Sequence, residues 1–364
     1  MQTSRDMTET VRIGIIGLGN IADIHCTNLR QLDQPVSIAA GVDVDADARR
    51  RFAETYDAAV YEEAAAMFET VDAVLVTTPN KFHEQYVVAA LEAGLDVLVE
   101  KPLAHTLESA ERIAAAADAA DGFCMVGFHN RFADPVQTLV GYRDAGDIGE
   151  VSHIEANYIR RRGVPGRGSW FTRSDVAGGG SLIDIGAHAI DLALHVADHP
   201  EVVEVSGDTR AQFGVDEEYA YVEMWGEDHG AAEFSVDDSA SAFIRCGDGT
   251  TISLEVAWAT NRPDSQEYYV RGTGAGAKLD LADQSLTLFE TADTGRMHHR
   301  TTDIETQRSD PQHREQARFV SAVRDGTPPS ANTVEQALRV QRVMDGIYRS
   351  SETGTAVSVG EAEP

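Results

Sequence analysis

Lysine is nearly absent from this chain of 364 residues, since it occurs only at Lys81, Lys101 and Lys278 and arginine supplies the other basic side chains. Sixty acidic residues against thirty basic ones give a formal net charge of -30. Such a charge repels nucleic acids and anionic membranes, so we exclude both as partners. An acidic, lysine-poor composition is typical of a folded protein kept soluble by concentrated salt, which screens the repulsion. We therefore expect a halophilic, cytoplasmic protein.

Cysteine and long apolar runs are also scarce. Cys26, Cys124 and Cys246 are far apart and form no Cys-x-x-Cys pair, which argues against a disulfide framework and a zinc knuckle. No run reaches eighteen apolar residues, and residues 1–10 lack the apolar core of a signal peptide, so we expect a flexible N-terminus on an intracellular protein. The hydrophobic residues make up 42% and recur periodically, which excludes a disordered acidic chain. The length favours two domains.

A glycine-rich turn follows the first apolar segment. The chain reads as a strand from Val11, continues through Gly17-x-Gly19-x-x-Ala22, and then becomes helical. Gly17 permits a tight turn, Gly19 lets a pyrophosphate approach the backbone, and Ala22 allows close packing of helix on strand. A second strand ends at Asp43, where this pattern places an acid for the ribose hydroxyls. The pattern predicts a dinucleotide site that favours NAD over NADP, although three arginines just downstream leave NADP possible.

Strands and helices then alternate as far as residue 128. This alternation predicts a doubly wound parallel sheet over residues 11–128, with ligands at the carboxyl ends of the strands. Two short segments, Thr77-Thr78-Pro79-Asn80 and Glu100-Lys101-Pro102, stand at such ends. They could be an ordinary turn and a surface ion pair. A lysine in a chain that otherwise uses arginine indicates instead that a compact ammonium is needed at position 101.

Residues 129–364 follow a different pattern. Short alternating strands separated by turn signals predict an antiparallel sheet, with strand-like runs that include residues 201–212, 219–225 and 250–260. Two helical stretches, 310–325 and 333–350, close the chain. We expect this second domain to bind the substrate and to form oligomers. The predicted fold class is therefore α/β, with an N-terminal Rossmann domain and a C-terminal α/β domain that carries a large, mostly antiparallel open sheet.

A glycine triplet at residues 178–180 opens an apolar helix in this second domain. Ser181 is expected to cap it, and Asp184 and His188 stand at i and i+4 on one face, close enough to exchange a proton. A buried pair that satisfies itself is the alternative. Asp191 and His195 extend the stripe and could suggest a metal, but three turns of helix are too long for one ion, so we predict no metal site.

The order of these motifs resembles the Gfo/Idh/MocA family, named for glucose-fructose oxidoreductase, inositol dehydrogenase and a rhizopine-catabolism protein. The resemblance rests on residues 14–22, 77–80, 100–102 and 178–188 and extends to the closing helices. It implies NAD or NADP as cofactor, a carbohydrate substrate, and a homodimer or homotetramer formed through the C-terminal sheet. By this resemblance Lys101, Asp184 and His188 are the catalytic residues. The cofactor-binding residues are expected to be Gly17, Leu18, Gly19, Asn20, Ile21, Asp43, Thr78, Pro79, Asn80, His83, Glu100 and Lys101.

The expected reaction is oxidation of a sugar or polyol hydroxyl, with His188 as general base and Lys101 stabilising the developing alkoxide. Asp184 would position the substrate or tune His188. Arg131 and Trp170 are added as substrate-binding residues, although a tryptophan in a loop is equally often a packing anchor. Arg160 to Arg162 could hold an acidic substituent of the substrate, but we favour the interpretation that they are a solvated strand end. A glycosidase-type or epimerase-type reaction that uses tightly held NAD transiently, and a nucleotide-binding sensor without turnover, stay as alternatives.

Overall fold

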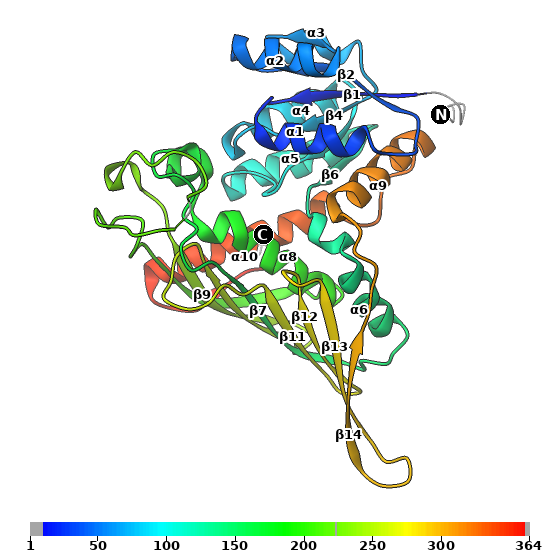
Figure 1. Ribbon diagram of the computed structural model, residues 1–364, viewed down its shortest axis with the longest axis vertical. Helices are drawn as coiled ribbons and strands as arrows, with labels where there is room; N and C mark the ends of the chain where they lie inside the picture. Colours follow the sequence, from blue (N-terminus) through cyan, green and yellow to red (C-terminus); the bar gives the residue numbers. More distant parts are fainter. Residues whose placement is uncertain (1–9, 223, 361–364) are drawn as a thin grey trace. The chain divides into compact units, whose positions relative to one another are not determined.

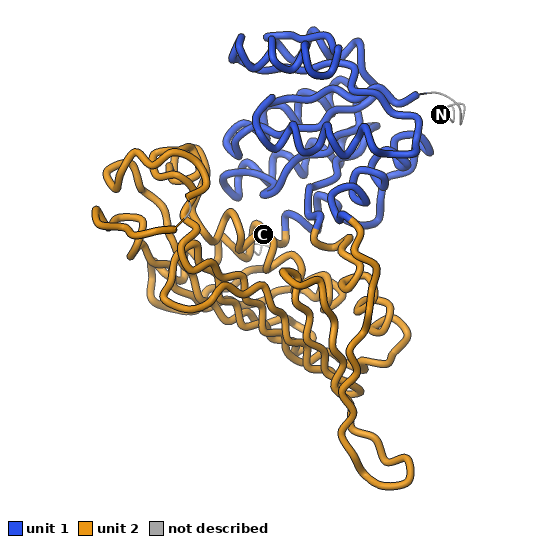
Figure 2. Tube along the Cα trace, in the orientation of Figure 1, with its two compact units in different colours: residues 1–129, 310–338 blue, residues 130–309, 339–364 orange. Residues whose placement is uncertain are grey.

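The computed structural model describes residues 10–222 and 224–360. The chain forms two compact units (Figure 2): unit 1 comprises residues 1–129 and 310–338, and unit 2 comprises residues 130–309 and 339–364. The expected flexible segment, residues 1–10, lies outside the described residues except for position 10. Each unit has its own sheet and its own core, as the length of the chain predicts.

Unit 1 contains a six-stranded parallel sheet in the order β3-β2-β1-β4-β5-β6 (Figure 1). This is the strand order of a dinucleotide-binding doubly wound fold, so the predicted Rossmann domain is confirmed. Its central strands are buried almost throughout, as expected for a parallel sheet covered on both faces. The strands are β1 (Val11–Ile16), β2 (Val36–Val42), β3 (Ala59–Tyr61), β4 (Ala73–Val76), β5 (Asp96–Val99) and β6 (Cys124–Val126). The helices are α1 (Asn20–Leu29), α2 (Ala46–Tyr56), α3 (Ala64–Phe68), α4 (His83–Glu92) and α5 (Leu107–Ala119), with a 3-10 turn, η1, at Asn80–Phe82.

Helix α9 (Pro311–Asp325) returns to unit 1 after the chain has built most of unit 2. It packs against α1 and β1. The rings of Phe319 and Phe123 meet edge to face with centroids 5.8 Å apart, and the Gln34 side chain donates to Ser321 Oγ at 2.7 Å. The prediction of one domain over residues 129–364 is therefore wrong for residues 310–338. Helical periodicity shows that a face is buried, but it does not show which sheet buries that face.

Unit 2 contains a nine-stranded sheet in the order β14-β13-β12-β11-β7-β10-β9-β8-β15. Every neighbouring pair is antiparallel except β7 and β10, which run parallel, so the predicted mostly antiparallel sheet is confirmed. The strands are β7 (Val151–Ile159), β8 (Val202–Arg210), β9 (Ser239–Cys246), β10 (Thr251–Ala257), β11 (Glu267–Gly272), β12 (Gly276–Asp280), β13 (Ser285–Ala292), β14 (His298–Ile304) and β15 (Val357–Ser358). The longer helices are α6 (Asp134–Asp144), α8 (Ala187–Val196) and α10 (Val334–Thr353).

The strand predicted at residues 219–225 is not formed over residues 219–222 and 224–225, the part of this segment that the structure describes. The described residues of this segment lie in irregular backbone, and Val222 is 97% exposed. Aromatic and β-branched side chains there match a strand in composition, but they have no neighbouring strand to pair with. The strands at residues 276–304 were not predicted, because their outer residues are polar and exposed.

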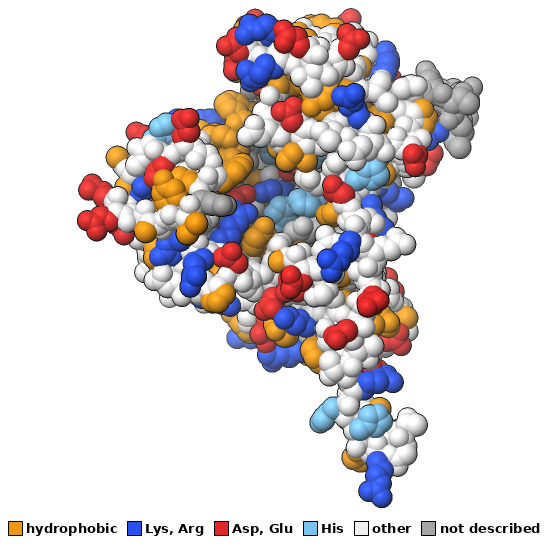
Figure 3. Space-filling model, in the orientation of Figure 1, with side chains coloured by type: hydrophobic (Ala, Val, Ile, Leu, Met, Phe, Trp, Pro, Cys, Tyr) orange, Lys and Arg blue, Asp and Glu red, His pale blue; other side chains and the backbone are white. Residues whose placement is uncertain are grey.

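Helices cover one face of the second sheet and leave the other open. Along β7, Ile154 and Ala156 are buried on the face where α8 packs, whereas His153 and Glu155 point to the opposite face. Figure 3 shows acidic and basic side chains interspersed over the visible surface. Within the described part of the chain no helix has the length and apolarity needed to cross a bilayer.

Candidate active site

The glycine turn of unit 1 has the geometry that a bound pyrophosphate requires. Gly17 has φ +92°, a backbone conformation that favours glycine. A Cβ there would stand 2.9 Å from the backbone nitrogen of Thr78, so only glycine fits where the chain after β1 passes the chain after β4. A Cβ on Gly19 would meet nothing within 4 Å, which leaves open space beside the first residues of α1. No side chain caps the N-terminus of α1. The backbone N–H groups of this turn therefore fit an anionic dinucleotide phosphate.

Asp43 at the end of β2 contacts the same turn. Its Oδ2 accepts from the backbone N–H of Leu18 at 2.8 Å, and its Oδ1 accepts from Asp45 N–H at the same distance. The carboxylate is half-buried and retains lone pairs for ribose hydroxyls. Arg49 donates to the Asp43 carbonyl at 2.6 Å and forms an ion pair with Glu62 at 3.6 Å. This arginine is engaged with the protein itself, which favours a site for an unphosphorylated ribose.

His83 joins the two turns at the carboxyl ends of β4 and β5. Nδ1 lies 2.9 Å from the carbonyl oxygen of Pro102 and Nε2 lies 2.9 Å from that of Thr78. The side chain is 1% exposed, and burial lowers the pKa of the imidazole. The prediction that His83 binds the cofactor is therefore corrected, because its ring is enclosed and holds the backbone of Thr78 and Pro102 in place.

Glu100 occupies a buried position directly before Lys101. Its Oε1 lies 2.6 Å from His25 Nε2 on α1, and its Oε2 accepts from the Lys101 backbone N–H at 3.1 Å. The other ring nitrogen of His25 lies 2.5 Å from Gln316 Nε2 on α9. Burial raises the pKa of Glu100, but the hydrogen bond and charge of His25, with Lys101, outweigh it and lower this pKa to about 2. Glu100 is thus a buried carboxylate that anchors the backbone of the half-buried Lys101, and its contact with the cofactor stays a prediction.

The glycine triplet of unit 2 allows very close backbone contact. A Cβ on Gly180 would stand 1.8 Å from the carbonyl oxygen of Asp237. The Asp237 carboxylate accepts from Gly180 N–H at 2.8 Å, from Leu182 N–H at 2.9 Å and from the Ser181 hydroxyl at 2.7 Å. Ser181 was expected to cap the helix, but it makes no cap hydrogen bond. Asp237, which precedes β9, supplies that interaction instead.

The segment that carries Asp184 is a π-helical turn, η4 (Leu182–Gly186), which continues directly into α8. His188 is in the first turn of α8 and is 7% exposed, whereas Asp184 is half-buried. The sequence predicts an unbroken α-helix here, and the spacing of side chains around a π-turn differs from that around an α-turn. Single π-turns inside α-helices occur frequently at functional sites.

Trp258 holds the carboxylate of Asp184. Its indole Nε1–H donates to Asp184 Oδ2 at 2.9 Å, and its side chain is fully buried. Arg160 directly follows β7 and Trp258 directly follows β10. These two residues lie side by side, because the last residues of the two parallel strands, Ile159 and Ala257, are paired. Burial acts to lower the pKa of Arg160, but Tyr158 and Asp184 outweigh that effect and raise it. Sequence reasoning missed Trp258 and interpreted Arg160 as solvated, because neither side chain is near Asp184 along the chain.

Arg131 is not exposed to a ligand. Its Nε and Nη2 donate to the two carboxylate oxygens of Asp191, at 2.9 and 2.5 Å, and both side chains are 1% exposed. Burial raises the pKa of Asp191, and the Arg131 guanidinium acts in the opposite direction. The prediction of Arg131 as a substrate-binding residue is corrected, because this bidentate pair links η2 (His129–Phe132) to α8 inside the protein.

Trp170 lies in the short turn η3 (Trp170–Thr172) that precedes the glycine triplet. Its ring stacks on Phe171, with centroids 3.7 Å apart, and Phe171 meets Trp225 edge to face at 4.8 Å. Trp170 is half-exposed, so one face of an aromatic cluster is accessible. No three His, Cys, Asp or Glu side chains within residues 10–222 and 224–360 have the arrangement of a metal site.

The chain matches two family models. Residues 11–128 match the model described as an oxidoreductase family with an NAD-binding Rossmann fold, and residues 136–278 match a GFO/IDH/MocA C-terminal domain. D-Glucoside 3-dehydrogenase of Escherichia coli is 32% identical over 96% of this chain and 97% of its own length. D-Xylose 1-dehydrogenase (NADP(+)) 2 of Haloferax volcanii is 27% identical over 82% of this chain and 83% of its own.

Solved structures share the fold across nearly the whole chain. Levoglucosan dehydrogenase in complex with NADH and levoglucosan superposes with a TM-score of 0.85 at 20% identity, covering 97% of this chain and all of that one. An oxidoreductase domain protein from Kribbella flavida superposes with a TM-score of 0.83 at 26% identity, over 97% of this chain and all of that one. These matches place both units in one known two-domain architecture.

Proposed function

Because the chain belongs to the Gfo/Idh/MocA family of NAD-binding oxidoreductases, we propose that it oxidises a secondary or anomeric hydroxyl of a sugar or polyol. The observation that carries this proposal is that each unit presents a partly accessible polar residue anchored by a buried neighbour: Glu100 accepts from the backbone N–H of Lys101, and Trp258 donates to the carboxylate of Asp184. The relatives support the substrate class, since those named above act on a glucoside, a xylose or levoglucosan by name.

Each unit contributes separate groups to the proposed reaction. A nicotinamide dinucleotide held by the glycine turn and Asp43 would supply the acceptor for the hydride that leaves the substrate carbon. His188 takes the hydroxyl proton, because an imidazole is a suitable base near neutral pH. Lys101 places a compact ammonium beside the developing alkoxide. Asp184 orients the substrate or His188, and Trp170 offers an apolar ring face for stacking on a sugar.

The residues of unit 1 support NAD as the preferred cofactor. The glycine turn fits a pyrophosphate, and Asp43 presents a carboxylate where the 2′-phosphate of NADP would be repelled. NADP is measured alongside NAD as cofactor, because the name of one relative, D-xylose 1-dehydrogenase (NADP(+)) 2, includes NADP(+). Four further predicted binding residues remain proposals. Asn20 and Ile21 begin α1 directly after the glycine turn, and Pro79 and Asn80 stand at the start of η1, after β4.

A substrate panel tests the proposed function. Aldoses, inositols, glucosides and sugar acids are supplied with NAD and with NADP at high salt, and formation of reduced nicotinamide is followed by absorbance. We expect stoichiometric reduced cofactor with at least one carbohydrate and none after His188→Ala. If a sugar is converted while no reduced cofactor accumulates, the transient-redox alternative is correct. Binding of cofactor without turnover of any carbohydrate would identify a sensor.

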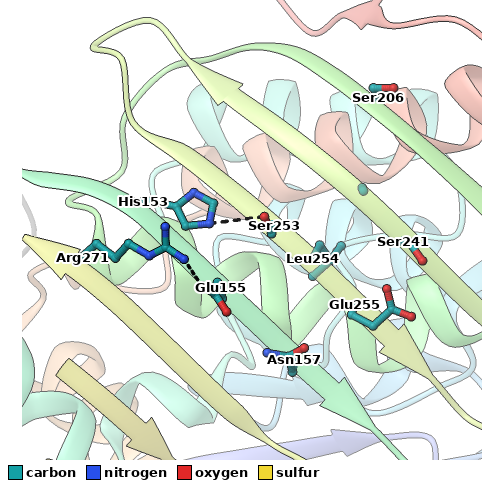
Figure 4. Close-up of a pocket in the computed structure, with 10 residues that line it drawn as sticks. His153, Glu155, Asn157, Ser206, Ser241, Ser253, Leu254, Glu255 and Arg271 are labelled. Carbon is teal, nitrogen blue, oxygen red and sulfur yellow. Dashed lines mark hydrogen bonds and ion pairs between the residues drawn. The ribbon is translucent and has the colours of Figure 1, made fainter. Parts of the chain in front are cut away.

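The open face of the second sheet is proposed as the surface for a homodimer or homotetramer. A pocket of about 470 Å³ lies on this face. Side chains of both charges line it, and Figure 4 labels Glu155, Glu255 and Arg271 among them. Glu155 pairs with Arg271 across β7 and β11, and His153 stacks on Phe243, which is 36% exposed. A two-fold axis brings one patch against itself, so acids and bases on the same patch can pair between copies.

Light scattering coupled to size exclusion tests this assembly. We expect a dimer or tetramer for the wild type and a smaller species for Phe243→Asp. Val222→Asp, which alters an exposed apolar side chain elsewhere in unit 2, is the control and should leave the mass unchanged. A monomeric wild type at micromolar concentration would contradict the proposal. Cytoplasmic location and adaptation to salt are proposed from the composition alone.

A further inference from the structure

The contact between Trp258 and Asp184 joins the most enclosed large side chain of unit 2 to a half-buried carboxylate. Trp258 has the largest of the fully buried side chains among the described residues, and its indole N–H donates to Asp184 Oδ2 at 2.9 Å. A hydrogen bond from a neutral donor to a carboxylate favours the ionised form of the acid and restricts its rotamers. The contact can therefore control both the charge and the direction of Asp184.

The backbone of Trp258 is fixed on both sides. Its N–H donates to the Asp238 carbonyl at 2.8 Å, and its own carbonyl accepts from Gly163 N–H at 2.7 Å. The preceding residue, Ala257, still belongs to β10 and accepts from Arg160 N–H at 2.8 Å. An indole on so restrained a backbone, without exposure, has little freedom to turn. It holds Asp184 in one orientation more firmly than a mobile surface side chain could.

The carboxylate itself is on a segment that needs such support. Asp184 is in the π-turn η4, whose backbone departs from regular α-helical hydrogen bonding. We propose that Trp258 is a positioning residue for the reaction, holding the Asp184 carboxylate in one orientation through its indole N–H. This inference rests on the proposed function, in which Asp184 orients the substrate or the general base.

Trp258→Phe tests the role in catalysis, since it removes the donor and keeps an aromatic ring. We expect kcat to fall at least tenfold, equivalent to about 1.4 kcal/mol of activation free energy, while the NAD dissociation constant stays within twofold. The acid limb of the kcat profile should move to higher pH, because the carboxylate protonates more readily without its donor, while the Arg160 guanidinium that also acts on Asp184 is the same in both proteins. Trp225→Phe, at an exposed position, is the control. Unchanged kcat and an unchanged profile in Trp258→Phe would overturn the proposal.

A double-mutant cycle separates positioning from general packing. In an Asp184→Ala background, Trp258→Phe should cause no further loss of kcat, because the indole acts only through that carboxylate. An additional tenfold loss in the double variant would show a packing role and overturn the proposal. The melting temperature of each variant is measured in parallel to confirm that it is folded.

The hydrogen bond can also be observed without altering Trp258. The chain has three tryptophans, so a ¹⁵N-edited NMR spectrum contains three indole N–H signals. Trp170→Phe and Trp225→Phe each remove one signal, and the signal present in both variants belongs to Trp258. We expect the Trp258 signal to be slow in solvent exchange and to shift in Asp184→Ala. A Trp258 signal indifferent to Asp184→Ala would overturn the proposal even if Trp258→Phe does not fold. This readout needs no substrate, so failure of the proposed function would be recognised separately.

Discussion

Removing the charge of Glu100 should destabilise unit 1 in a pH-dependent way. Glu100 is 8% exposed, and its carboxylate meets His25 Nε2 at 2.6 Å and the Lys101 backbone N–H at 3.1 Å. These contacts tie α1, the end of β5 and, through Gln316, the returning helix α9 into one network. The substitution Glu100→Gln keeps the size of the side chain and removes its charge.

The magnitude follows from the pKa of this carboxyl, which falls from 4.5 to about 2 in the folded protein. A lowered folded-state pKa stabilises the protein at pH values above the unfolded pKa. At pH 7 the contribution is about 3 kcal/mol. It is lost as the pH falls from 4.5 toward 2, so part of it, on the order of 1 kcal/mol, is already lost at pH 3.5.

Urea unfolding at high salt, followed by circular dichroism, measures this contribution. We expect Glu100→Gln to unfold more easily than the wild type by about 3 kcal/mol at pH 7, with the difference shrinking toward pH 3.5. The other carboxylates titrate in both proteins and cancel from the comparison. His25→Ala should cost about 3–5 kcal/mol, because it leaves a buried charge without its partner.

Glu84→Gln is the matched control. Glu84 also pairs with a basic side chain, Arg112, at 2.5 Å, but on the surface of unit 1, where water competes for both groups. Its substitution should change the free energy of unfolding much less than Glu100→Gln does. A difference between wild type and Glu100→Gln that stays constant from pH 7 to pH 3.5 would refute the assignment of Glu100 as a buried, ionised anchor.

Three further predictions concern the cofactor, the catalytic lysine and salt. Asp43→Ser should shift the ratio of kcat/KM toward NADP by about tenfold, or about 1.4 kcal/mol, in steady-state assays, and an unchanged ratio would remove Asp43 from cofactor selection. Lys101→Arg should lower kcat about a hundredfold, or 2.7 kcal/mol, while fluorescence titration shows intact NAD binding and Lys278→Arg stays near wild type; near-normal turnover would exclude a catalytic Lys101. Removing salt should lower the melting temperature, because unscreened carboxylates repel one another, and full activity in dilute buffer would contradict the halophilic interpretation.

The fold of unit 1 could be predicted because its signals are local. Helix α5 (Leu107–Ala119) begins after Thr106, whose side chain accepts from the Ser109 N–H at 3.2 Å, and such a cap is a local signal in the sequence. The glycine turn was also recognisable, since Gly17 needs a positive φ that the sequence pattern anticipates. Alternating strands and helices then specify a parallel sheet with few possible topologies.

The contacts that support the site could not be predicted, because they join residues far apart in the sequence. Trp258 is 74 positions from Asp184, and Gln316 is 291 positions from His25. Arg131 appeared suited to substrate binding until the structure paired it with Asp191, 60 positions away. A charged residue in a sequence shows that a partner or a ligand is needed, but it does not show which of the two it has.

The same arrangement recurs at the candidate catalytic residues of the two units. Lys101 and Asp184 are partly accessible, and each is anchored by a residue with little or no exposure: Glu100 accepts from the backbone N–H of Lys101, and Trp258 donates to the carboxylate of Asp184. A group that meets substrate must keep some exposure, yet the chain that carries it must be fixed in position before the substrate arrives. A buried anchoring residue such as Glu100 or Trp258 meets both requirements, because it fixes the position of its neighbour from inside the core and leaves that neighbour accessible. Loss of function should therefore follow from substitution of enclosed residues that touch no ligand.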